Sequence, residues 1–253
     1  MAVKRIALIT GATSGIGEAT ARLLAKNHFK LILCGRRKDR LNLLDTELSK
    51  VTEIKTLSFD VRQKEDIHKA IVSLEEKWKD IDVLINNAGN AHGLDPIQSG
   101  NTDDWDAMMD INVKGLLYVS REILPGMVER KLGHIINLGS IAGKEVYPNG
   151  NVYSASKFAV DALSRGMRLD LNAYGIKVTA IHPGLVETEF SVVRFKGDAE
   201  RAGTVYKGIQ PLKGADIADL ILFALTRPAH VAIADLVVFP TAQASATIIN
   251  RVP

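Results

Sequence analysis

Short hydrophobic runs alternate with longer amphipathic stretches along most of the chain. The short runs are rich in β-branched and apolar residues, which is typical of strands, whereas the amphipathic stretches are long enough for helices. The pattern predicts strands over 5–10, 30–34, 54–59, 83–86, 134–138, 177–181 and 236–239. It predicts helices over 15–27, 39–50, 63–78, about 103–130 and 152–174.

This order of segments indicates successive βαβ units. Several of the strands are continuous apolar runs, which favours a parallel sheet that is covered by helices on both faces. The predicted fold class is therefore α/β, with a doubly wound parallel sheet of about seven strands. At 253 residues and 46% hydrophobic content, we expect one domain over residues 1–253. The least regular stretch, 187–211, follows the sixth strand and is predicted to fold over a bound ligand as a lid.

The composition narrows the possible classes of function. An excess of 32 Lys and Arg over 29 Asp and Glu leaves a net charge of +3, too small to favour a nucleic-acid surface. Cys34 is the single cysteine and lies in an apolar run, which favours a buried thiol rather than a disulfide. No apolar stretch has membrane-spanning length, and the chain begins without a signal-peptide pattern. We expect a soluble cytoplasmic protein that binds neither nucleic acid nor a membrane.

A glycine-rich segment joins the first predicted strand to the first predicted helix. Its spacing is Gly-x-x-x-Gly-x-Gly, and glycines at such a junction let a pyrophosphate approach the backbone N–H groups of the helix N-terminus. The candidate phosphate-binding residues are Gly11, Ala12, Thr13, Ser14, Gly15, Ile16 and Gly17. The same spacing also suits a tight strand-to-helix turn without a ligand.

The ends of the next strands carry further candidates for a dinucleotide site. Arg36 and Arg37 follow the second strand, where NAD-binding proteins place an acidic residue, so two guanidiniums favour the extra phosphate of NADP. The alternative is a pair of solvated arginines at the start of an exposed helix. The turns after the third and fourth strands should border the same cleft, although Asn and Gly are also common turn formers. Their candidate residues are Asp60, Val61, Asn87, Ala88 and Gly89.

Tyr153 and Lys157 are four residues apart in Tyr-Ser-Ala-Ser-Lys and indicate proton-transfer chemistry. One helical turn places both side chains on the same face. A free phenol has a pKa of about 10, and a neighbouring cation, here Lys157 together with an oxidised nicotinamide, should lower it toward neutral pH. The alternative is a half-buried aromatic beside a solvated lysine.

The histidines do not form a metal-binding motif. His92, His134 and His182 are far apart in the sequence, and none has a short-range ligand spacing to another. We therefore expect no required metal.

Together these motifs resemble the short-chain dehydrogenase/reductase family over nearly the whole chain. The shared features, in order and approximate spacing, are the glycine loop, Asn86 to Gly89, Asn112 in Asn-Val-Lys-Gly, Ser140, Tyr153, Lys157 and Pro183-Gly184. The resemblance implies a Rossmann-type fold and hydride transfer with NADP(H). It also implies that Tyr153 is the acid/base, that Ser140 hydrogen-bonds the substrate oxygen, and that Asn112 holds a water in a proton relay. Lys157 would bind the nicotinamide ribose and lower the pKa of the phenol.

The family resemblance further implies where the cofactor is held. The glycine loop would bind the phosphates, Arg36 and Arg37 the 2′-phosphate, Asp60 and Val61 the adenine, and Asn87 the neighbouring ribose. The segment after the sixth strand would meet the carboxamide and pyrophosphate through Pro183, Gly184, Val186 and Thr188.

Four segments look like the NADP-dependent 3-hydroxy acid dehydrogenases, a subgroup that acts on serine, allo-threonine and related acids or reduces malonic semialdehyde. They are 124–130, 184–190, 193–198 and 227–231. In the predicted lid, Arg194 is a candidate to hold a substrate carboxylate through two hydrogen bonds. The alternative is a surface arginine on a mobile loop.

The expected function is therefore NADP-dependent interconversion of a short 3-hydroxy acid and its 3-oxo form. A reductase of another carbonyl, such as a 3-oxoacyl thioester or a bulky ketone, is the main alternative because this fold hosts many substrates. A non-catalytic NADPH-sensing protein is a third possibility. The tail beyond Pro240 is apolar for a chain end, and together with the homotetrameric habit of the subgroup it predicts a homotetramer.

Overall fold

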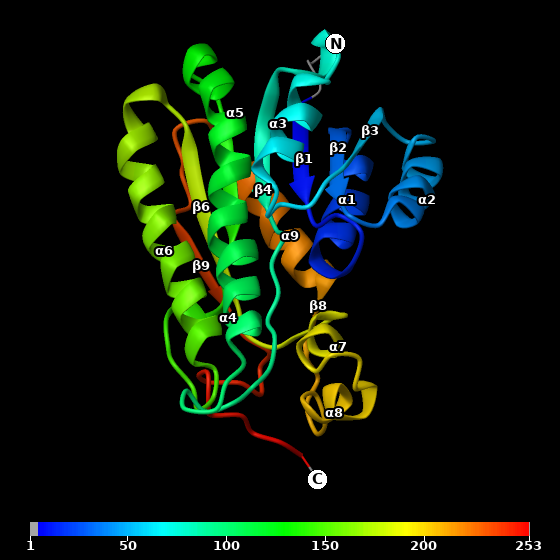
Figure 1. Cartoon of the computed structure of the whole chain (residues 1–253). Helices are drawn as coiled ribbons and strands as arrows, with labels where there is room; N and C mark the ends of the chain where they lie inside the picture. The colour runs from blue at the N-terminus through cyan, green and yellow to red at the C-terminus, as the bar shows by residue number, and fades with distance from the viewer. Residues whose placement is uncertain (1–4, 253) are drawn as a thin grey trace.

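A seven-stranded parallel sheet forms the centre of the molecule. The computed structural model describes residues 5–252, and within them the strand order of this sheet is β3-β2-β1-β4-β5-β6-β9 (Figure 1). Its strands are β1 (Ile6–Thr10), β2 (Lys30–Gly35), β3 (Ile54–Ser58), β4 (Ile81–Asn86), β5 (His134–Leu138), β6 (Lys177–Pro183) and β9 (Asp235–Val238). The predicted α/β fold class and the seven strands are confirmed.

Helices cover both faces of this sheet (Figure 1). One hydrophobic core lies against α3 (Lys64–Val72), α5 (Leu116–Arg130) and α6 (Asn151–Leu171). The second lies against α1 (Gly15–Lys26), α2 (Lys38–Leu48) and α9 (Gly214–Leu225). Because successive side chains of a strand point to opposite faces, β1 supplies Leu8 to the first core and Ile9 to the second, and both are fully buried. Because both faces are buried, the sequences of the central strands do not alternate between apolar and polar residues.

The predicted long helix over about 103–130 is in fact three segments. Helix α4 (Thr102–Met109) continues into a π-helical segment, Asp110–Gly115, before α5 begins. The wider turn contains Asn112, whose amide makes hydrogen bonds to other parts of the chain. The spacing of apolar residues does not predict this π-helical turn, because the spacing is helical on both sides of it.

Several other elements differ from the sequence predictions. Helix α3 ends at Val72 and is followed by a 3₁₀ turn, Glu76–Trp78, so the predicted helix over 63–78 is too long. A 3₁₀ turn, Asn172–Tyr174, ends α6. Helix α9, which connects the sixth strand to the last one, was not predicted. A short second sheet pairs β7 (Val186–Glu187) with β8 (Leu212–Lys213).

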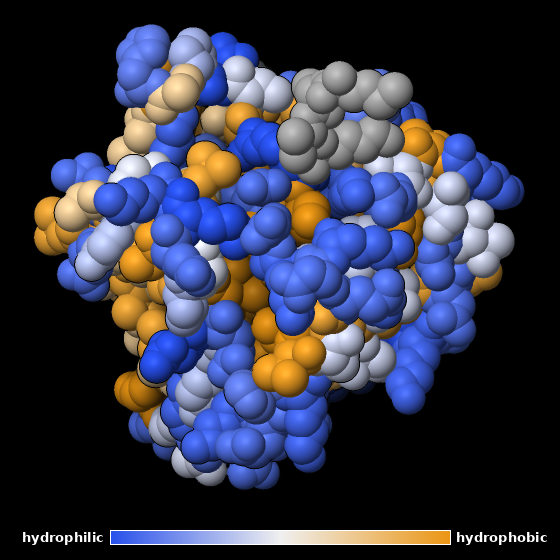
Figure 2. Space-filling view, turned by 90° about the horizontal axis from the view of Figure 1, so that it is seen from above, coloured by the Kyte–Doolittle hydropathy of each residue, from blue (hydrophilic) through white to orange (hydrophobic). Residues whose placement is uncertain are grey.

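The segment predicted to be irregular contains two short helices, α7 (Phe190–Arg194) and α8 (Ala199–Thr204). They lie with the C-terminal end of the chain at the lower end of the molecule in Figure 1. Figure 2 looks onto the molecule from above, where hydrophilic residues cover much of the surface with smaller hydrophobic groups between them. Among residues 5–252, no helix is both long and apolar enough to cross a membrane.

The strand order places a switch point between β1 and β4. From β1 the chain proceeds outward to β2 and β3 and then returns to β4 on the other side of β1. The loops after these two strands therefore diverge and leave a crevice at the carboxyl ends of the strands, where doubly wound folds bind ligands.

Candidate active site

A cleft of about 510 Å³ occupies this crevice. Apart from Ala12, Gly17 and Asn112, every site residue predicted from the sequence lines it. These are Gly11, Thr13, Ser14, Gly15, Ile16, Arg36, Arg37, Asp60, Val61, Asn87, Ala88, Gly89, Ser140, Tyr153, Lys157, Pro183, Gly184, Val186, Thr188 and Arg194. The fold thus brings together residues from seven separate segments of the sequence.

The glycine loop has the backbone geometry of a phosphate cradle. Gly11 and Gly15 have φ angles of +63° and +55°, in the left-handed region that favours glycine. A side chain on Gly17 would collide with the Gly11 carbonyl oxygen and the Asn87 amide. Ser14 precedes α1 without a capping hydrogen bond from its side chain, so the first N–H groups of the helix remain available to an anion. Ala12 and Gly17 shape the loop from behind and do not line the cleft.

The turn after β4 is fastened to this loop. The Asn87 side-chain amide donates to the carbonyl oxygens of Thr10 and Gly11 at 2.9 and 3.1 Å. The Thr10 hydroxyl in turn accepts from the backbone N–H groups of Asn87 and Ala88 at 3.1 and 3.0 Å. Hydrogen bonds therefore connect the two sides of the switch point, and the side chain of Asn87 supplies two of them.

At the end of β2, the two predicted arginines have different surroundings. The Arg36 guanidinium lies 3.7 Å from the Asp60 carboxylate, and its side chain is 62% exposed. Arg37 donates to the hydroxyl and carbonyl oxygens of Thr13, and it forms a 2.8 Å ion pair with Glu189. Val61 lies close to Gly115 of the π-helical segment, so the turn after β3 also packs against the cleft wall.

The reactive groups gather where β5 and α6 meet. Tyr153 and Lys157 are buried on one face of α6, with the Lys157 ammonium 6.0 Å from the centre of the phenol ring. Lys157 Nζ donates a 2.9 Å hydrogen bond to the Leu138 carbonyl oxygen at the end of β5. Ser140 follows two residues later, and its hydroxyl interacts with the phenol of Tyr153. Burial of both members argues against the alternative of a solvated lysine.

The electrostatics of this pair differ from the expectation of a lowered phenol pKa. Burial is the largest influence on Tyr153 and raises the pKa of the phenol, with a further increase from Tyr147. The Ser140 hydrogen bond and the Arg194 guanidinium lower this pKa without reversing the increase. Burial also lowers the pKa of Lys157 to about 8. Within the protein itself, desolvation outweighs charge, because both groups are removed from water and the ammonium is directed to a carbonyl.

Asn112 lies behind the cleft wall rather than on it. Its side-chain amide donates to the Asn90 carbonyl oxygen at 2.8 Å and to the Ser156 hydroxyl at 3.0 Å. Its side-chain oxygen accepts from the Asn90 N–H at 2.9 Å. The side chain therefore joins the π-helical segment to the turn after β4 and to α6. Its role in a water relay stays a prediction.

Arg194 reaches from α7 to the reactive end of the cleft. Its guanidinium carbon lies 5.4 Å from the centre of the Tyr153 ring, and Nη2 donates to the Tyr147 hydroxyl at 2.7 Å. Nε donates to the Gly93 carbonyl oxygen at 3.1 Å. Phe190 packs against Tyr153 with 5.6 Å between ring centres. Arg194 is thus a partly buried cation beside the phenol, and not a surface arginine.

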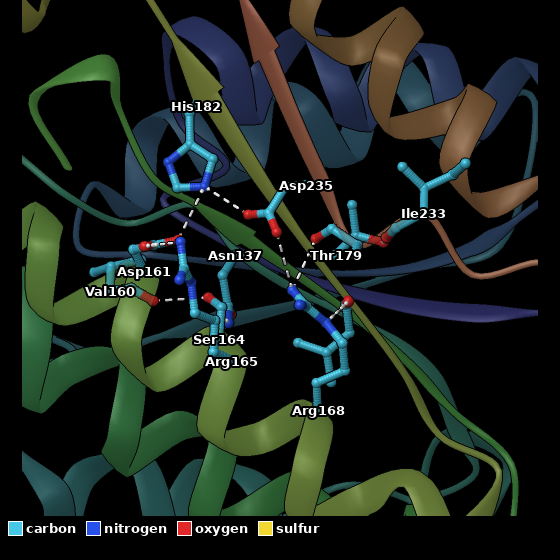
Figure 3. Close-up of polar contacts among 12 residues, drawn as sticks. Asn137, Val160, Asp161, Ser164, Arg165, Arg168, Thr179, His182, Ile233 and Asp235 are labelled. Carbon is cyan, nitrogen blue, oxygen red and sulfur yellow. Dashed lines mark hydrogen bonds and ion pairs between the residues drawn. The ribbon is translucent and has the colours of Figure 1, made fainter. Parts of the chain in front are cut away.

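A charged cluster around His182 (Figure 3) also contacts the segment that carries Ser140. His182 Nδ1 lies 3.3 Å from the Ser140 carbonyl oxygen, and Nε2 lies 3.2 and 3.6 Å from carboxylate oxygens of Asp235 and Asp161. A side chain on Gly139 would collide with the His182 ring. The segment that carries Ser140 therefore rests on a fully buried histidine.

The same cluster brings three potential metal ligands together. Ligand atoms of Asp161, His182 and Asp235 lie within 4.8 Å of one another, a proximity that their sequence spacing does not reveal. However, Lys144 Nζ lies 2.6 Å from Asp161 and 3.4 Å from Asp235, where it supplies positive charge between the carboxylates. Arg165 and Arg168 also contact them (Figure 3). That the protein requires no metal stays a prediction.

Several cleft residues were not predicted as site residues from the sequence, among them Tyr147, Phe190 and Glu189. Tyr147 and Phe190 form walls around Tyr153, and Glu189 and Arg40 lie beside Arg37. Arg40 had a detectable signal, because it is three residues after Arg37 and shares its face of α2. Tyr147 and Glu189 lie in loops and Phe190 begins α7, and the tertiary fold decides the path of these segments across the cleft.

Comparison with known proteins agrees with this geometry. Residues 5–198 match the family model described as short chain dehydrogenase. The chain belongs to the short-chain dehydrogenase family. This match covers the sheet as far as β6, the glycine loop and the Tyr153–Lys157 pair, and it ends within the segment that carries Arg194.

Individual members of the short-chain dehydrogenase family match over nearly the full length. The NADP-dependent 3-hydroxy acid dehydrogenase YdfG of Salmonella typhi is 47% identical over 242 residues, 95% of this chain and 97% of that protein. Sulfoacetaldehyde reductase 2 of Chromohalobacter salexigens is 43% identical over 248 residues, 97% of this chain and 98% of that protein. The closed form of serine dehydrogenase complexed with NADP+ superimposes with a TM-score of 0.92 at 45% identity, covering 95% of this chain and 97% of that one.

Proposed function

We propose that the protein is an NADP-dependent oxidoreductase that interconverts a short 3-hydroxy acid and its 3-oxo form. Serine, allo-threonine and 3-hydroxypropionate represent the substrate class. The observation that carries this proposal is the position of Arg194, a guanidinium 5.4 Å from the ring of Tyr153. A 3-hydroxy acid has one carbon between its hydroxyl-bearing carbon and its carboxyl carbon. One small molecule can therefore contact both the phenol and the guanidinium.

Tyr153 is the acid/base of the proposed reaction. In oxidation its phenolic oxygen takes the proton of the substrate hydroxyl, and in reduction the phenol returns a proton to the carbonyl oxygen. The Ser140 hydroxyl hydrogen-bonds the same substrate oxygen. It interacts with the Tyr153 phenol, so both groups can contact one atom. Arg194 orients the substrate by its carboxylate and favours acids over uncharged alcohols.

Lys157 and Asn112 complete the proposed catalytic set. Lys157 holds the nicotinamide ribose, and its ammonium lies 6.0 Å from the centre of the Tyr153 ring. Asn112 keeps the π-helical segment in place through its contacts with Asn90 and Ser156, and it positions a water in the proton relay.

The residues of the cleft fit an NADP molecule. The left-handed glycines, the uncapped start of α1 and the arginines after β2 form a succession of anion-binding groups along the cleft. When bound, the nicotinamide accepts or supplies the hydride. The residues proposed to hold the cofactor are Gly11, Ala12, Thr13, Ser14, Gly15, Ile16, Gly17, Arg36, Arg37, Asp60, Val61, Asn87, Ala88, Gly89, Tyr153, Lys157, Pro183, Gly184, Val186 and Thr188.

We further propose that residues 187–211 act as the substrate lid of a single-domain enzyme. The contacts of Arg194 with Tyr147 and Gly93 support this, because they connect the segment to the opposite wall of the cleft. The working form is a cytoplasmic homotetramer. Exposed apolar residues in the tail, among them Ile248 and Val252, support subunit contacts there. A particle of four chain masses in light scattering is expected, and a monomer would contradict this assembly.

The substrate proposal is tested with a panel of acids and matched alcohols. The purified enzyme is assayed for NADPH production from serine, allo-threonine, 3-hydroxypropionate and the corresponding alcohols without a carboxylate. We expect turnover of the acids and about tenfold or greater loss of kcat/KM for them in Arg194→Met, since a hydrogen-bonded charge is removed. Arg227→Met is the matched control, because Arg227 stacks on the exposed Phe223 and neither residue lines the cleft.

Other results would replace this substrate class. Equal kcat/KM values of wild type and Arg194→Met with the acids would refute the carboxylate contact. Reduction of a 3-oxoacyl thioester or a bulky ketone in preference to the short acids would establish the alternative reductase. NADPH binding without turnover of any alcohol or carbonyl compound would favour the sensing protein.

A further inference from the structure

Glu189 occupies the position between the two arginines nearest the glycine loop. It is the residue immediately before α7, and its carboxylate oxygens accept hydrogen bonds from Arg37 at 2.8 Å and from Arg40 at 2.6 Å. Arg37 directs its remaining donors to Thr13, with bonds of 3.1 to 3.2 Å to the hydroxyl and carbonyl oxygens. Each of the three guanidinium nitrogens of Arg37 therefore has a contact, two with the loop and one with Glu189.

Glu189 bears a full negative charge at neutral pH. Partial burial acts to raise the pKa of its carboxyl, but hydrogen bonds from Arg37 and Arg40 outweigh burial and lower the pKa. The three side chains are each about 40% exposed, so their pairing is an exchangeable contact near the surface. A second anion at Arg37 would lie close to this carboxylate and share its donors.

The neighbouring carboxylates have other partners. Glu187, two residues earlier, pairs with Lys213 across the small sheet. Asp60 receives hydrogen bonds from Arg62 and lies 3.7 Å from Arg36. Among the described residues, Glu189 is the carboxylate that forms ion pairs with Arg37 and Arg40. An anionic ligand that binds these two arginines would therefore lie next to the negative charge of Glu189.

We propose that Glu189 is a specificity-determining residue that competes with the cofactor 2′-phosphate for Arg37 and Arg40. The phosphate shares these guanidiniums with a nearby carboxylate of like charge, so that Glu189 weakens NADP binding and reduces the preference for NADP over NAD. This inference depends on the proposed NADP site, because the 2′-phosphate is the group that distinguishes the two cofactors.

The test uses two probes that differ by the 2′-phosphate alone, adenosine 2′,5′-bisphosphate and adenosine 5′-monophosphate. Their dissociation constants are measured calorimetrically for the wild type, Glu189→Gln, Glu189→Ala and the control Glu187→Gln. Both Glu189 variants should bind the bisphosphate about three- to tenfold more tightly, the effect expected of removing one nearby like charge. The monophosphate constant should stay unchanged in all variants, and Glu187→Gln should match the wild type. Thermal melting confirms that each variant is folded.

The outcomes separate this inference from the function on which it rests. If the wild type binds the bisphosphate no more tightly than the monophosphate, the NADP site is wrong and the Glu189 proposal fails with it. If the wild type prefers the bisphosphate but the Glu189 variants bind it equally or more weakly, the competition alone is refuted. Weaker binding would show that Glu189 preorganises Arg37 for the phosphate.

Discussion

The two ends of the cleft are built from charged and polar groups in opposite ways. At the reactive end, Tyr153 and Lys157 are buried, and Lys157 is held by a backbone carbonyl. At the other end, Arg37 and Glu189 are about 40% exposed and pair with each other, and Arg37 also donates to Thr13. A buried polar group that is bonded to the backbone keeps one arrangement, because leaving it unpaired costs much free energy. An exposed ion pair can exchange its partners at a small cost in free energy.

This difference indicates how each end responds to a ligand. The reactive end is preorganised, so a substitution there should abolish chemistry without a compensating rearrangement. At the phosphate end, the Glu189 carboxylate bonds to the arginines that are expected to bind the phosphate. Substitutions there should therefore raise or lower the affinity for the cofactor, depending on which partner is removed. The comparison predicts large losses of rate at one end and graded changes in binding at the other.

The largest effect should come from Tyr153→Phe. The ring and its packing against Phe190 remain, but the exchangeable proton is lost, so kcat should fall by a factor of roughly a hundred or more. Steady-state assays with the best acid of the panel measure this, and Tyr174→Phe, at an exposed phenol, serves as the control. Rates near those of the wild type would remove Tyr153 from the mechanism.

A smaller effect is expected at the phosphate end. Replacing both Arg36 and Arg37 with Ala should weaken NADP by about tenfold or more, because charge-assisted hydrogen bonds are lost, while NAD affinity changes little. Fluorescence titrations with both cofactors measure the ratio, and the exposed Lys38→Ala is the control on the same turn. Equal losses for the two cofactors would mean that these arginines do not contact the phosphate.

His182 tests whether the reactive end depends on its supporting cluster. His182→Gln removes a buried ring beneath Gly139 and Ser140, and a loss of roughly tenfold in kcat is expected from the displaced hydroxyl. The cofactor dissociation constant should not change. In a Ser140→Ala background the same substitution should cost much less. Losses that multiply in the double variant would show that His182 does not act through Ser140.

The mildest prediction concerns stability and its pH dependence. Burial lowers the pKa of Lys157 from 10.5 in the unfolded chain to about 8. Between these values the unfolded state binds the extra proton, so the free energy of unfolding should rise with pH. Relative to Lys157→Met, the wild type should gain about 1 kcal/mol from pH 8 to pH 9, measured by urea denaturation. A constant difference across that range would contradict a buried, titrating ammonium.

The sequence predicted most of the elements because its hydrophobic pattern is nearly unbroken. Strand β5 has its predicted bounds, whereas α6 begins one residue before its predicted start and ends three residues before its predicted end. The predictions failed where local propensity competes with long-range contacts. The wide turn at Asn112 depends on Asn90 and Ser156, and helix α9 was missed although it packs its apolar side on the sheet.

The sequence by itself determined the parallel α/β fold, the glycine loop and the pairing of Tyr153 with Lys157. Each follows from local spacing: apolar runs, glycines at a strand-to-helix junction, and one helical turn between two side chains. Only the tertiary structure decided that Arg194 lies beside Tyr153, that Glu189 lies between Arg37 and Arg40, and that His182 supports Ser140. These neighbours are 41 to 152 residues apart in the chain, and packing of the sheet, rather than local spacing, brings them together.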